Sequence, residues 1–288
     1  LKHGPKQFIF TDEGNIKRYL GVEVTRLDDG SGFVMAQPFL IERILQAAEI
    51  DTKVTNGRPT PVVGPLLSKD ENGPQRKHTW KYHTLTGMLG YLQWTSRPDI
   101  SMATHQCARL NNAPMLCHER AIKRICKYLL GTMDKGMIFR PNMERGLECH
   151  VDADFAGGWS SGDTQNPEAV LSCTGFVISY AGCPIYWASK LQTEIGLSTA
   201  EAENIALSMA MREVLHFLNL MQEINTVLPL PAGAPKFFCK VWEDNQSCIK
   251  VAESPKFTPR TKHIALKYHH FRDHVNNGTV EIESIDTK

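Results

Sequence analysis

The sequence predicts an α/β fold in two domains. Residues 146–288 are expected to form a mixed five-stranded sheet flanked by helices, preceded by a smaller, mostly helical α+β domain in residues 1–145. The length of 288 residues suits two domains, and 42% hydrophobic residues is enough for buried cores. In the second half, strand and helix periodicities follow the order three strands, helix, strand, two helices, strand, which is typical of an α/β sandwich with a mixed sheet.

The first domain opens with a hairpin and a helix. Two strands around the turn Asp28-Asp29-Gly30 are expected within residues 18–37, and apolar positions at helical spacing predict a helix at 38–48. Residues 51–75 are rich in Pro, Gly, Thr and Asp and predict a long loop. Apolar periodicity then predicts three helices and a strand, at residues 79–94, 98–112, 117–131 and 136–140.

The third of these helices carries cations opposite its apolar side. Four cations lie there, Arg120, Lys123, Arg124 and Lys127, of which the last three are called the basic face below, and Glu119 is the only acid nearby to balance them. We predict that the basic face binds the phosphates of a nucleic acid backbone. An ordinary solvated helix surface is the alternative.

The second domain begins with strands at residues 147–153, 173–180 and 184–188, the last two joined by a tight turn at Ala181-Gly182. Ser198 opens the longest helix, because apolar positions with a period near 3.6 follow it. The remaining elements are a strand, two helices and a strand, at residues 237–243, 245–253, 261–276 and 280–285.

Charge is divided unevenly between the two halves. Residues 1–145 hold 21 Lys and Arg against 14 Asp and Glu, whereas residues 146–288 hold 11 against 17. This division suggests a basic module that neutralises a polyanion, joined to a module that gathers carboxylates around divalent metal ions. Uneven surface composition is the simpler alternative.

Composition also excludes several classes of protein. No apolar run approaches the roughly 18–20 residues of a membrane-spanning helix, and residues 1–4 lack the pattern of a secretion signal. The eight cysteines include no Cys-x-x-Cys pair, which excludes a zinc ribbon and predicts buried free thiols. The chain begins at Leu1 without Met, so we expect a piece of a longer polyprotein.

Three acids are expected at the ends of elements in the second domain. Asp152 lies late in a strand, Glu201 in the first turn of the longest helix, and Asp244 directly after a strand. Each has a structural alternative: Asp152 as a loop cap, Glu201 in a capping box with Ser198, and Asp244 as a helix N-cap. Strand ends and a helix N-terminus can meet at one edge of a sheet, where clustered carboxylates repel each other unless a cation neutralises them. We therefore predict a magnesium site.

Polar side chains flank these acids. Ser198, Thr199, Asn245 and Gln246 are expected to hydrogen-bond to a substrate phosphate or to a ribose 2′-hydroxyl, the group that distinguishes RNA from DNA. Helix capping is the alternative for these residues.

Four segments carry a specific family resemblance. In order and spacing they closely resemble the ribonuclease H domain of copia-type LTR retrotransposon polyproteins. These segments are Val151-Asp152-Ala153-Asp154-Phe155-Ala156-Gly157, Leu197-Ser198-Thr199-Ala200-Glu201-Ala202-Glu203, Glu243-Asp244-Asn245-Gln246-Ser247 and Arg260-Thr261-Lys262-His263-Ile264. The first domain resembles the thumb and connection region at the end of the reverse transcriptase in the same polyproteins. The segments that carry this second resemblance are Tyr19-Leu20-Gly21-Val22-Glu23-Val24, Thr95-Ser96-Arg97-Pro98-Asp99-Ile100 and Lys127-Tyr128-Leu129-Leu130-Gly131-Thr132.

The resemblance implies a ribonuclease H, an endonuclease that cuts the RNA strand of an RNA/DNA hybrid with two Mg²⁺ or Mn²⁺ ions. It makes Asp152, Glu201 and Asp244 the metal-binding and catalytic carboxylates. Glu203 points about 200° around the helix from Glu201, so both cannot face one site. The implied partners are the hybrid and the upstream reverse transcriptase polymerase region, and the implied location is the cytoplasm, within virus-like particles.

The chain also departs from the family pattern. The polymerase signature Tyr-x-Asp-Asp is absent from the sequence, so we expect no DNA synthesis by this chain alone. Family order puts a fourth carboxylate beyond the strand that ends at Ile285, and we expect the second domain to lack it. Asp286 is a late acid in a loop position and is not expected to replace it. The alternative function is therefore a catalytically weak or inactive hybrid-binding scaffold.

Overall fold

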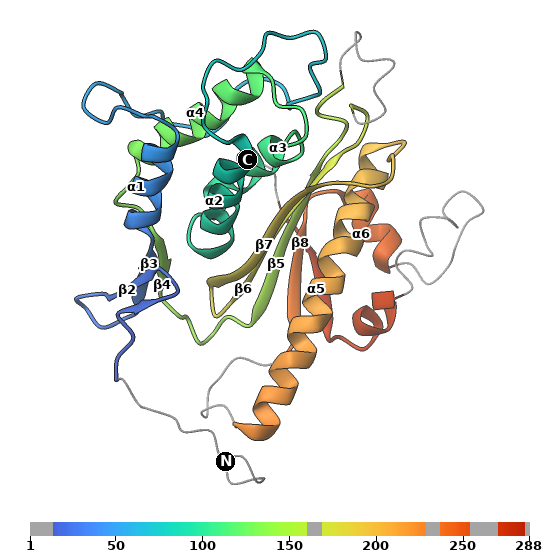
Figure 1. Cartoon of the computed structure of the whole chain (residues 1–288). Helices are drawn as coiled ribbons and strands as arrows, with labels where there is room; N and C mark the ends of the chain where they lie inside the picture. Colours follow the sequence, from blue (N-terminus) through green and yellow to red (C-terminus); the bar gives the residue numbers. More distant parts are fainter. Residues whose placement is uncertain (1–13, 160–168, 229–236, 254–269, 286–288) are drawn as a thin grey trace, which may run out of the picture.

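The computed structural model of the chain describes residues 14–159, 169–228, 237–253 and 270–285. Within them the strands form two sheets, one of four strands in the first half and one of five strands in the second (Figure 1). Each half has its own cluster of buried hydrophobic side chains. The fold is thus an α/β sheet with flanking helices, preceded by a smaller and mostly helical α+β part, as the sequence predicts.

The first sheet is antiparallel throughout. Its strands lie in the order β1 (Arg18–Tyr19), β2 (Val22–Arg26), β3 (Phe33–Ala36) and β4 (Met137–Phe139). The predicted turn between β2 and β3 is present, and Gly30 takes the positive φ of 68° that favours glycine. Helix α1 (Pro38–Ala47) follows and starts with a proline, whose missing N–H costs nothing in the first turn.

Three further helices pack with α1 around the first core. They are α2 (Tyr82–Thr95), α3 (Ser101–Ala108) and α4 (Leu116–Leu130), and the 3₁₀ turn η1 (Pro98–Ile100) precedes α3. The predicted helix at 98–112 is therefore divided and ends earlier than expected. Residues 51–75 contain no helix or strand, as the sequence predicts. The core includes fully buried side chains from three of these helices: Ile41, Ile44, Leu85, Leu89, Ile122 and Leu129.

The second sheet is mixed and has the strand order β7-β6-β5-β8-β9. Strands β5 (Leu147–Asp154), β6 (Cys173–Tyr180) and β7 (Cys183–Leu191) form an antiparallel meander, and β8 (Cys239–Glu243) and β9 (Val280–Ser284) run parallel to β5. Ala181 and Gly182 join β6 to β7 with φ of 51° and 75°. Positive φ at both residues is typical of the tightest hairpin turns.

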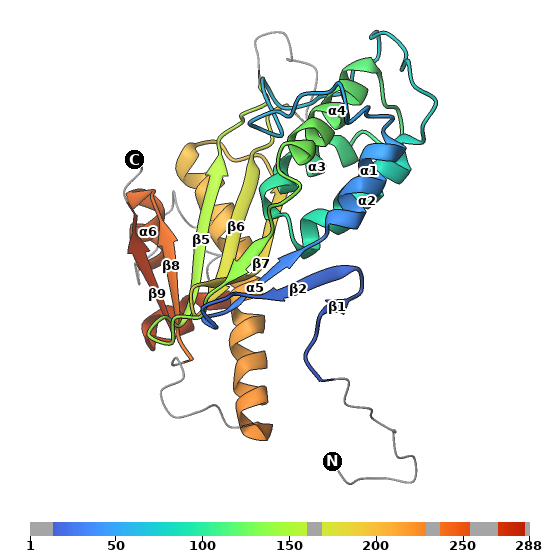
Figure 2. The ribbon, with the colours of Figure 1, turned by 90° about the vertical axis from the view of Figure 1, so that its left-hand side faces the viewer.

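Helix α5 (Thr199–Val227) lies along one face of this sheet (Figure 2). Ala202, Ala206 and Ala210 are completely buried there, and their small side chains allow the helix to approach the strands closely. Helix α6 (Gln246–Glu253) follows β8 in the segment of chain between β8 and β9. Residues 270–276 are helical, whereas the first part of the predicted helix at 261–276, with its Arg260–Ile264 motif, lies outside the described residues.

The two halves are joined through β7. Trp187 on β7 donates from Nε1 to the carbonyl of Gln93 on α2 at 2.9 Å, and the backbone N–H of Leu191 donates to His105 Nε2 on α3 at 3.2 Å. The proposed domain boundary at residue 145 falls in the connection between β4 and β5.

The eight cysteines are free thiols, and seven of them are buried, as the sequence predicts. Among the described helices, none has both the length and the hydropathy needed to cross a bilayer.

Candidate metal centre

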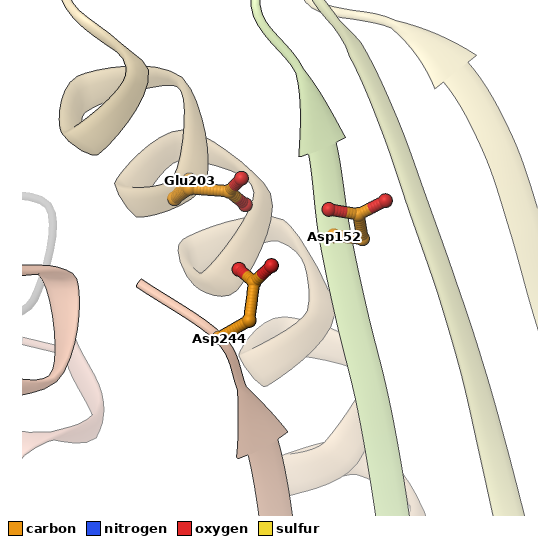
Figure 3. A group of neighbouring side chains, drawn as sticks. All are labelled: Asp152, Glu203 and Asp244. Carbon is orange, nitrogen blue, oxygen red and sulfur yellow. The ribbon is translucent and has the colours of Figure 1, made fainter. Parts of the chain in front are cut away.

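Three carboxylates converge at one end of the second sheet (Figure 3). Asp152 comes from β5, Glu203 from α5, and Asp244 from the residue after β8. One oxygen from each lies within 4.8 Å of the others. Side chains from three elements far apart in the sequence thus meet at one point.

Strand register places two of these acids side by side. Strands β5 and β8 run parallel, and their last paired residues are His150 and Trp242. Asp152 and Asp244 each lie two residues beyond that pair, so they stand at the same level along the two chains. Helix α5 starts at this same end of the sheet, and its first turns bring in the third acid.

The acid that α5 contributes is Glu203, and the prediction of Glu201 is corrected. The Glu201 carboxylate accepts a hydrogen bond from the backbone N–H of Leu197 at 2.9 Å, away from the other two acids. Ser198 Oγ accepts from the backbone N–H of Glu201 at 3.2 Å, so Glu201 belongs to the helix-capping arrangement that was its structural alternative. Residues two apart on a helix point about 200° from each other, so only one of the two glutamates can face Asp152.

The helix period contained a signal for Glu203. This residue precedes Leu207, Ala210 and Val214 by four, seven and eleven positions, which places it on the side of α5 that those buried residues line. Glu203 itself is only 3% exposed. A glutamate on the apolar side of a helix indicates a site, because burial of an unpartnered charge is costly.

Burial and neighbouring charges act strongly on Glu203. Burial, followed by repulsion from Glu243, Asp152 and Asp244, raises the pKa of Glu203 to about 8. A hydrogen bond from the backbone of Ala153 opposes this rise. The Oε2 atom of Glu203 is buried and has no hydrogen-bond partner among the described residues. A divalent cation would satisfy this oxygen and cancel the repulsion.

The donor set fits magnesium or manganese. All three side chains offer carboxylate oxygens, which hard cations of this kind prefer. Asp152 is exposed and Asp244 is partly exposed, so the buried Glu203 marks the closed side and the two aspartates the side open to solvent. A substrate can therefore reach ions held by these three side chains.

A groove extends from Asp152 across the face of the sheet opposite α5. It has a volume of about 460 Å³ and lies between β5 to β7 and the η1–α3 segment, with Asp152, Asp154, Gly175, Ser189, Pro98 and Met102 among its lining residues. A larger hollow of about 940 Å³ lies between the first sheet and α2, and its lining includes no acidic residue. The smaller groove therefore reaches Asp152, whereas Glu203 and Asp244 are not among its lining residues.

Two of the predicted substrate-binding residues cap helices. Ser198 caps α5 as described, and Asn245 Oδ1 accepts from the backbone N–H groups of Ser247 and Cys248 at 3.0 and 3.1 Å. Asn245 thus holds the start of α6, and the alternative of Asp244 as its N-cap does not apply. Gln246 Nε2 donates to Ser284 Oγ at 2.6 Å, and Thr199 is exposed in the first turn of α5. Substrate contact by these residues stays a prediction.

The basic face of α4 is partly covered by the long loop that precedes α2. Arg124 donates to Thr60 Oγ1 at 2.9 Å, Lys123 contacts His78, and Lys127 is partly buried. These three side chains are therefore only partly exposed to solvent, and two of them contact residues of the loop. Phosphate binding by this face stays a prediction. Asp286, the late acid of the sequence, lies outside the described residues.

Comparison with known proteins shows that the chain is similar to one segment of much longer polyproteins. No family model matches it. The chain is 31% identical to the retrovirus-related Pol polyprotein from transposon TNT 1-94 of Nicotiana tabacum, over 98% of this chain and 20% of the polyprotein. It is 27% identical to the corresponding polyprotein from transposon RE1 of Arabidopsis thaliana, over 98% of this chain and 18% of that one. The chain therefore spans about a fifth of the length of these relatives.

A solved structure similar to part of the chain is that of LC11-RNase H1, isolated from compost. It is 15% identical with a TM-score of 0.33, and the match covers 49% of this chain and 84% of that one.

Proposed function

Because this chain belongs to the family of Pol polyproteins of copia-type retrotransposons, we propose that it is a metal-dependent ribonuclease H that cleaves the RNA strand of RNA/DNA hybrids. The observation that carries the proposal is the convergence of Asp152, Glu203 and Asp244 at one end of a mixed α/β sheet. Such a group of oxygen ligands suits hydrolysis of a phosphodiester, a reaction in which negative charge develops on the attacking and leaving oxygens.

The three carboxylates would hold magnesium or manganese. These ions, when bound, supply an activated water and stabilise the leaving oxygen of an in-line phosphoryl displacement. Glu203, anchored by the backbone of Ala153 and closed off from solvent, fixes the inner side of the site. Asp152 and Asp244 lie on the open side, where the scissile phosphate would approach.

Hybrid recognition would combine the groove beside Asp152 with the polar start of α5. Ser198 and Thr199 are exposed there, at the start of the helix that contributes Glu203. Hydrogen bonds to a 2′-hydroxyl would select RNA, while cations of the first half, including the basic face of α4, would bind phosphates without regard to sequence. The upstream reverse transcriptase polymerase region would be the partner that supplies the hybrid.

The test is cleavage of a labelled RNA/DNA hybrid with Mg²⁺ or Mn²⁺, next to RNA/RNA and DNA/DNA duplexes. We expect cleavage of the RNA strand of the hybrid alone, reduced about 100-fold or more by Asp152→Asn and by Glu203→Gln. Glu201→Gln is the matched control and should cleave as the unmodified chain does, because Glu201 faces Leu197.

Cleavage that survives Asp152→Asn would refute the site. Tight binding of the hybrid without cleavage in either metal would instead favour the scaffold function.

A further inference from the structure

A buried glutamine, Gln192, lies between the start of α5 and the second sheet. It directly follows β7 and is 1% exposed. Its Nε2 atom donates to the backbone carbonyl of Ala202 on α5 at 2.9 Å and to Thr174 Oγ1 on β6 at 3.0 Å. One side-chain amide therefore connects the first turn of α5 to the strand beside β5.

Both partners of this amide adjoin residues of the candidate metal centre. Ala202 directly precedes Glu203 on α5. Thr174 is buried and pairs in register with Ala153, which directly follows Asp152. The amide thus links the two chain segments that carry Glu203 and Asp152, and its bonds lie one residue away from each acid.

The backbone around this glutamine is also held in place. The N–H of Gln192 donates to the carbonyl of Ser172 at 2.8 Å, and Ser172 is completely buried. Further along the same segment, a Cβ on Gly196 would lie 3.0 Å from the backbone nitrogen of Ala202, so a side chain there would press on the start of α5. The connection from β7 to α5 therefore packs tightly against the helix.

An amide in this position has a cost and a specific effect. Gln192 Oε1 is buried and has no hydrogen-bond partner within the described part of the chain, a cost that an apolar side chain would avoid. The two bonds from Nε2, however, depend on direction as well as distance, whereas the apolar contacts between α5 and the sheet do not. The amide therefore resists rotation of α5 about its axis.

This rotation sets where the Glu203 carboxylate lies. Helix side chains extend about 5–6 Å from the axis, so a rotation of about 20° moves a carboxylate by about 2 Å. Mg²⁺ binds its oxygen ligands at about 2.0–2.1 Å with a tolerance of about 0.2 Å. A small rotation of α5 is therefore enough to separate Glu203 from a cation held by Asp152.

We propose that Gln192 is a positioning residue of the metal centre, whose amide fixes the rotation of α5 and so holds Glu203 where it shares a cation with Asp152. The inference rests on the proposed function, since it takes the three carboxylates to be a cation site. Gln192 acts through the backbone of Ala202 and does not itself bind the cation.

The experiment replaces two buried glutamines, one at a time, by methionine, which keeps most of the length and bulk but has no amide. Gln192→Met removes the bonds to Ala202 and Thr174. Gln37→Met is the matched control, because Gln37 is also 1% exposed and its Oε1 atom accepts from Ser96 Oγ at 2.8 Å, within the first half. Both variants should have a lower Tm than the unmodified chain, since each loses buried hydrogen bonds.

The readout is Mn²⁺ affinity, measured on the folded full chain from the electron paramagnetic resonance signal of the free ion. Gln192→Met should bind Mn²⁺ about 10–100-fold more weakly, the usual effect of losing a group that holds a metal ligand in place, and Gln37→Met should bind it as the unmodified chain does. Addition of Gln192→Met to Glu203→Gln should cause little further loss, because the amide acts through Glu203.

Equal Mn²⁺ affinity of Gln192→Met and the unmodified chain would overturn the inference and make Gln192 a structural residue like Gln37. Additive losses in the double variant, or no Mn²⁺ binding by the unmodified chain, would overturn it as well. If a thermal melt shows that Gln192→Met does not fold, Gln192→Asn replaces it, because this variant keeps an amide and withdraws it by one methylene. The same loss of affinity is then expected, and unchanged affinity overturns the inference.

Hybrid cleavage measured on the same samples separates this inference from the proposed function. Mn²⁺ binding that depends on Gln192, without cleavage of any hybrid, would keep the positioning role and reject the ribonuclease. Cleavage by the unmodified chain, with Mn²⁺ affinity that Gln192→Met does not change, would keep the ribonuclease and reject the positioning role.

Discussion

Replacement of Glu203 by Gln should remove a pH-dependent loss of stability. Burial and neighbouring acids raise the pKa of Glu203 from its ordinary value of 4.5 to about 8, so the folded, metal-free protein retains a proton that the unfolded chain releases. The folded state therefore binds more protons between these two pH values, and the free energy of unfolding falls as pH rises through that window. Above pH 8 the loss is complete.

The magnitude follows from the width of the window. Each pH unit is worth about 1.4 kcal/mol, so a carboxyl whose pKa moves from 4.5 to about 8 costs on the order of 5 kcal/mol above pH 8. For a protein of this size, that corresponds to a fall in Tm on the order of 10 °C in chelator. In Glu203→Gln most of this slope should vanish. Glu243, whose pKa burial raises to about 7, leaves a smaller slope of the same sign.

The assay is Tm between pH 5 and 9 in chelator, repeated with saturating Mg²⁺. Magnesium should restore the stability of the unmodified chain at pH 8, because a ligand that binds only the folded state stabilises it by mass action. Glu203→Gln should gain little from Mg²⁺, and Glu201→Gln should behave like the unmodified chain in both series. Parallel pH slopes for the unmodified chain and Glu203→Gln would refute the placement of Glu203 in the buried acidic group.

Three further perturbations test other parts of the structure. Charge reversal of the three cations in the basic face of α4 should weaken hybrid binding and reduce its salt dependence, measured by fluorescence anisotropy at several salt concentrations; unchanged binding would leave these side chains a purely structural role. Asn245→Ala removes the N-cap of α6 and should lower the free energy of unfolding by about 1 kcal/mol in urea, whereas Asn245→Ser keeps an uncharged side-chain acceptor and should lower it less. Trp187→Phe removes the hydrogen bond to Gln93 that joins the two halves and also shrinks a buried side chain, so it should cost at least about 1 kcal/mol in the same assay; no change would refute a stabilising role for this contact.

Local signals in the sequence predicted most elements of the fold. The turn at Ala181-Gly182 and the start of α5 at Ser198 both depend on residues within a few positions of each other, and the structure contains both. The helix predicted at 98–112 was wrong in detail, because it is divided into η1 and α3. The spacing of apolar residues does not distinguish a 3₁₀ turn from the start of an α-helix.

The candidate site was only partly predictable. The sequence by itself determined that Asp152 and Asp244 stand at strand ends, and that only one of Glu201 and Glu203 can join them, because residues two apart on a helix point in nearly opposite directions. Which of the two glutamates faces the sheet depends on how α5 is rotated about its axis. That rotation is decided by packing of Ala202, Ala206 and Ala210 against the strands.

Burial is the other property that only the tertiary structure decided. Glu243 reads in the sequence as one more acid beside Asp244; alternation along the strand places it on the same face as Cys239 and Val241, but no local signal shows that a carboxylate at the end of the strand is buried. The parallel pairing of β8 with β5 and β9, and the cover from α5 and α6, take this side chain out of water and place it near Glu203. Local sequence determines where side chains lie along their elements. Contacts between distant elements determine which carboxylates are buried close together, and therefore which of them repel each other and have raised pKa values.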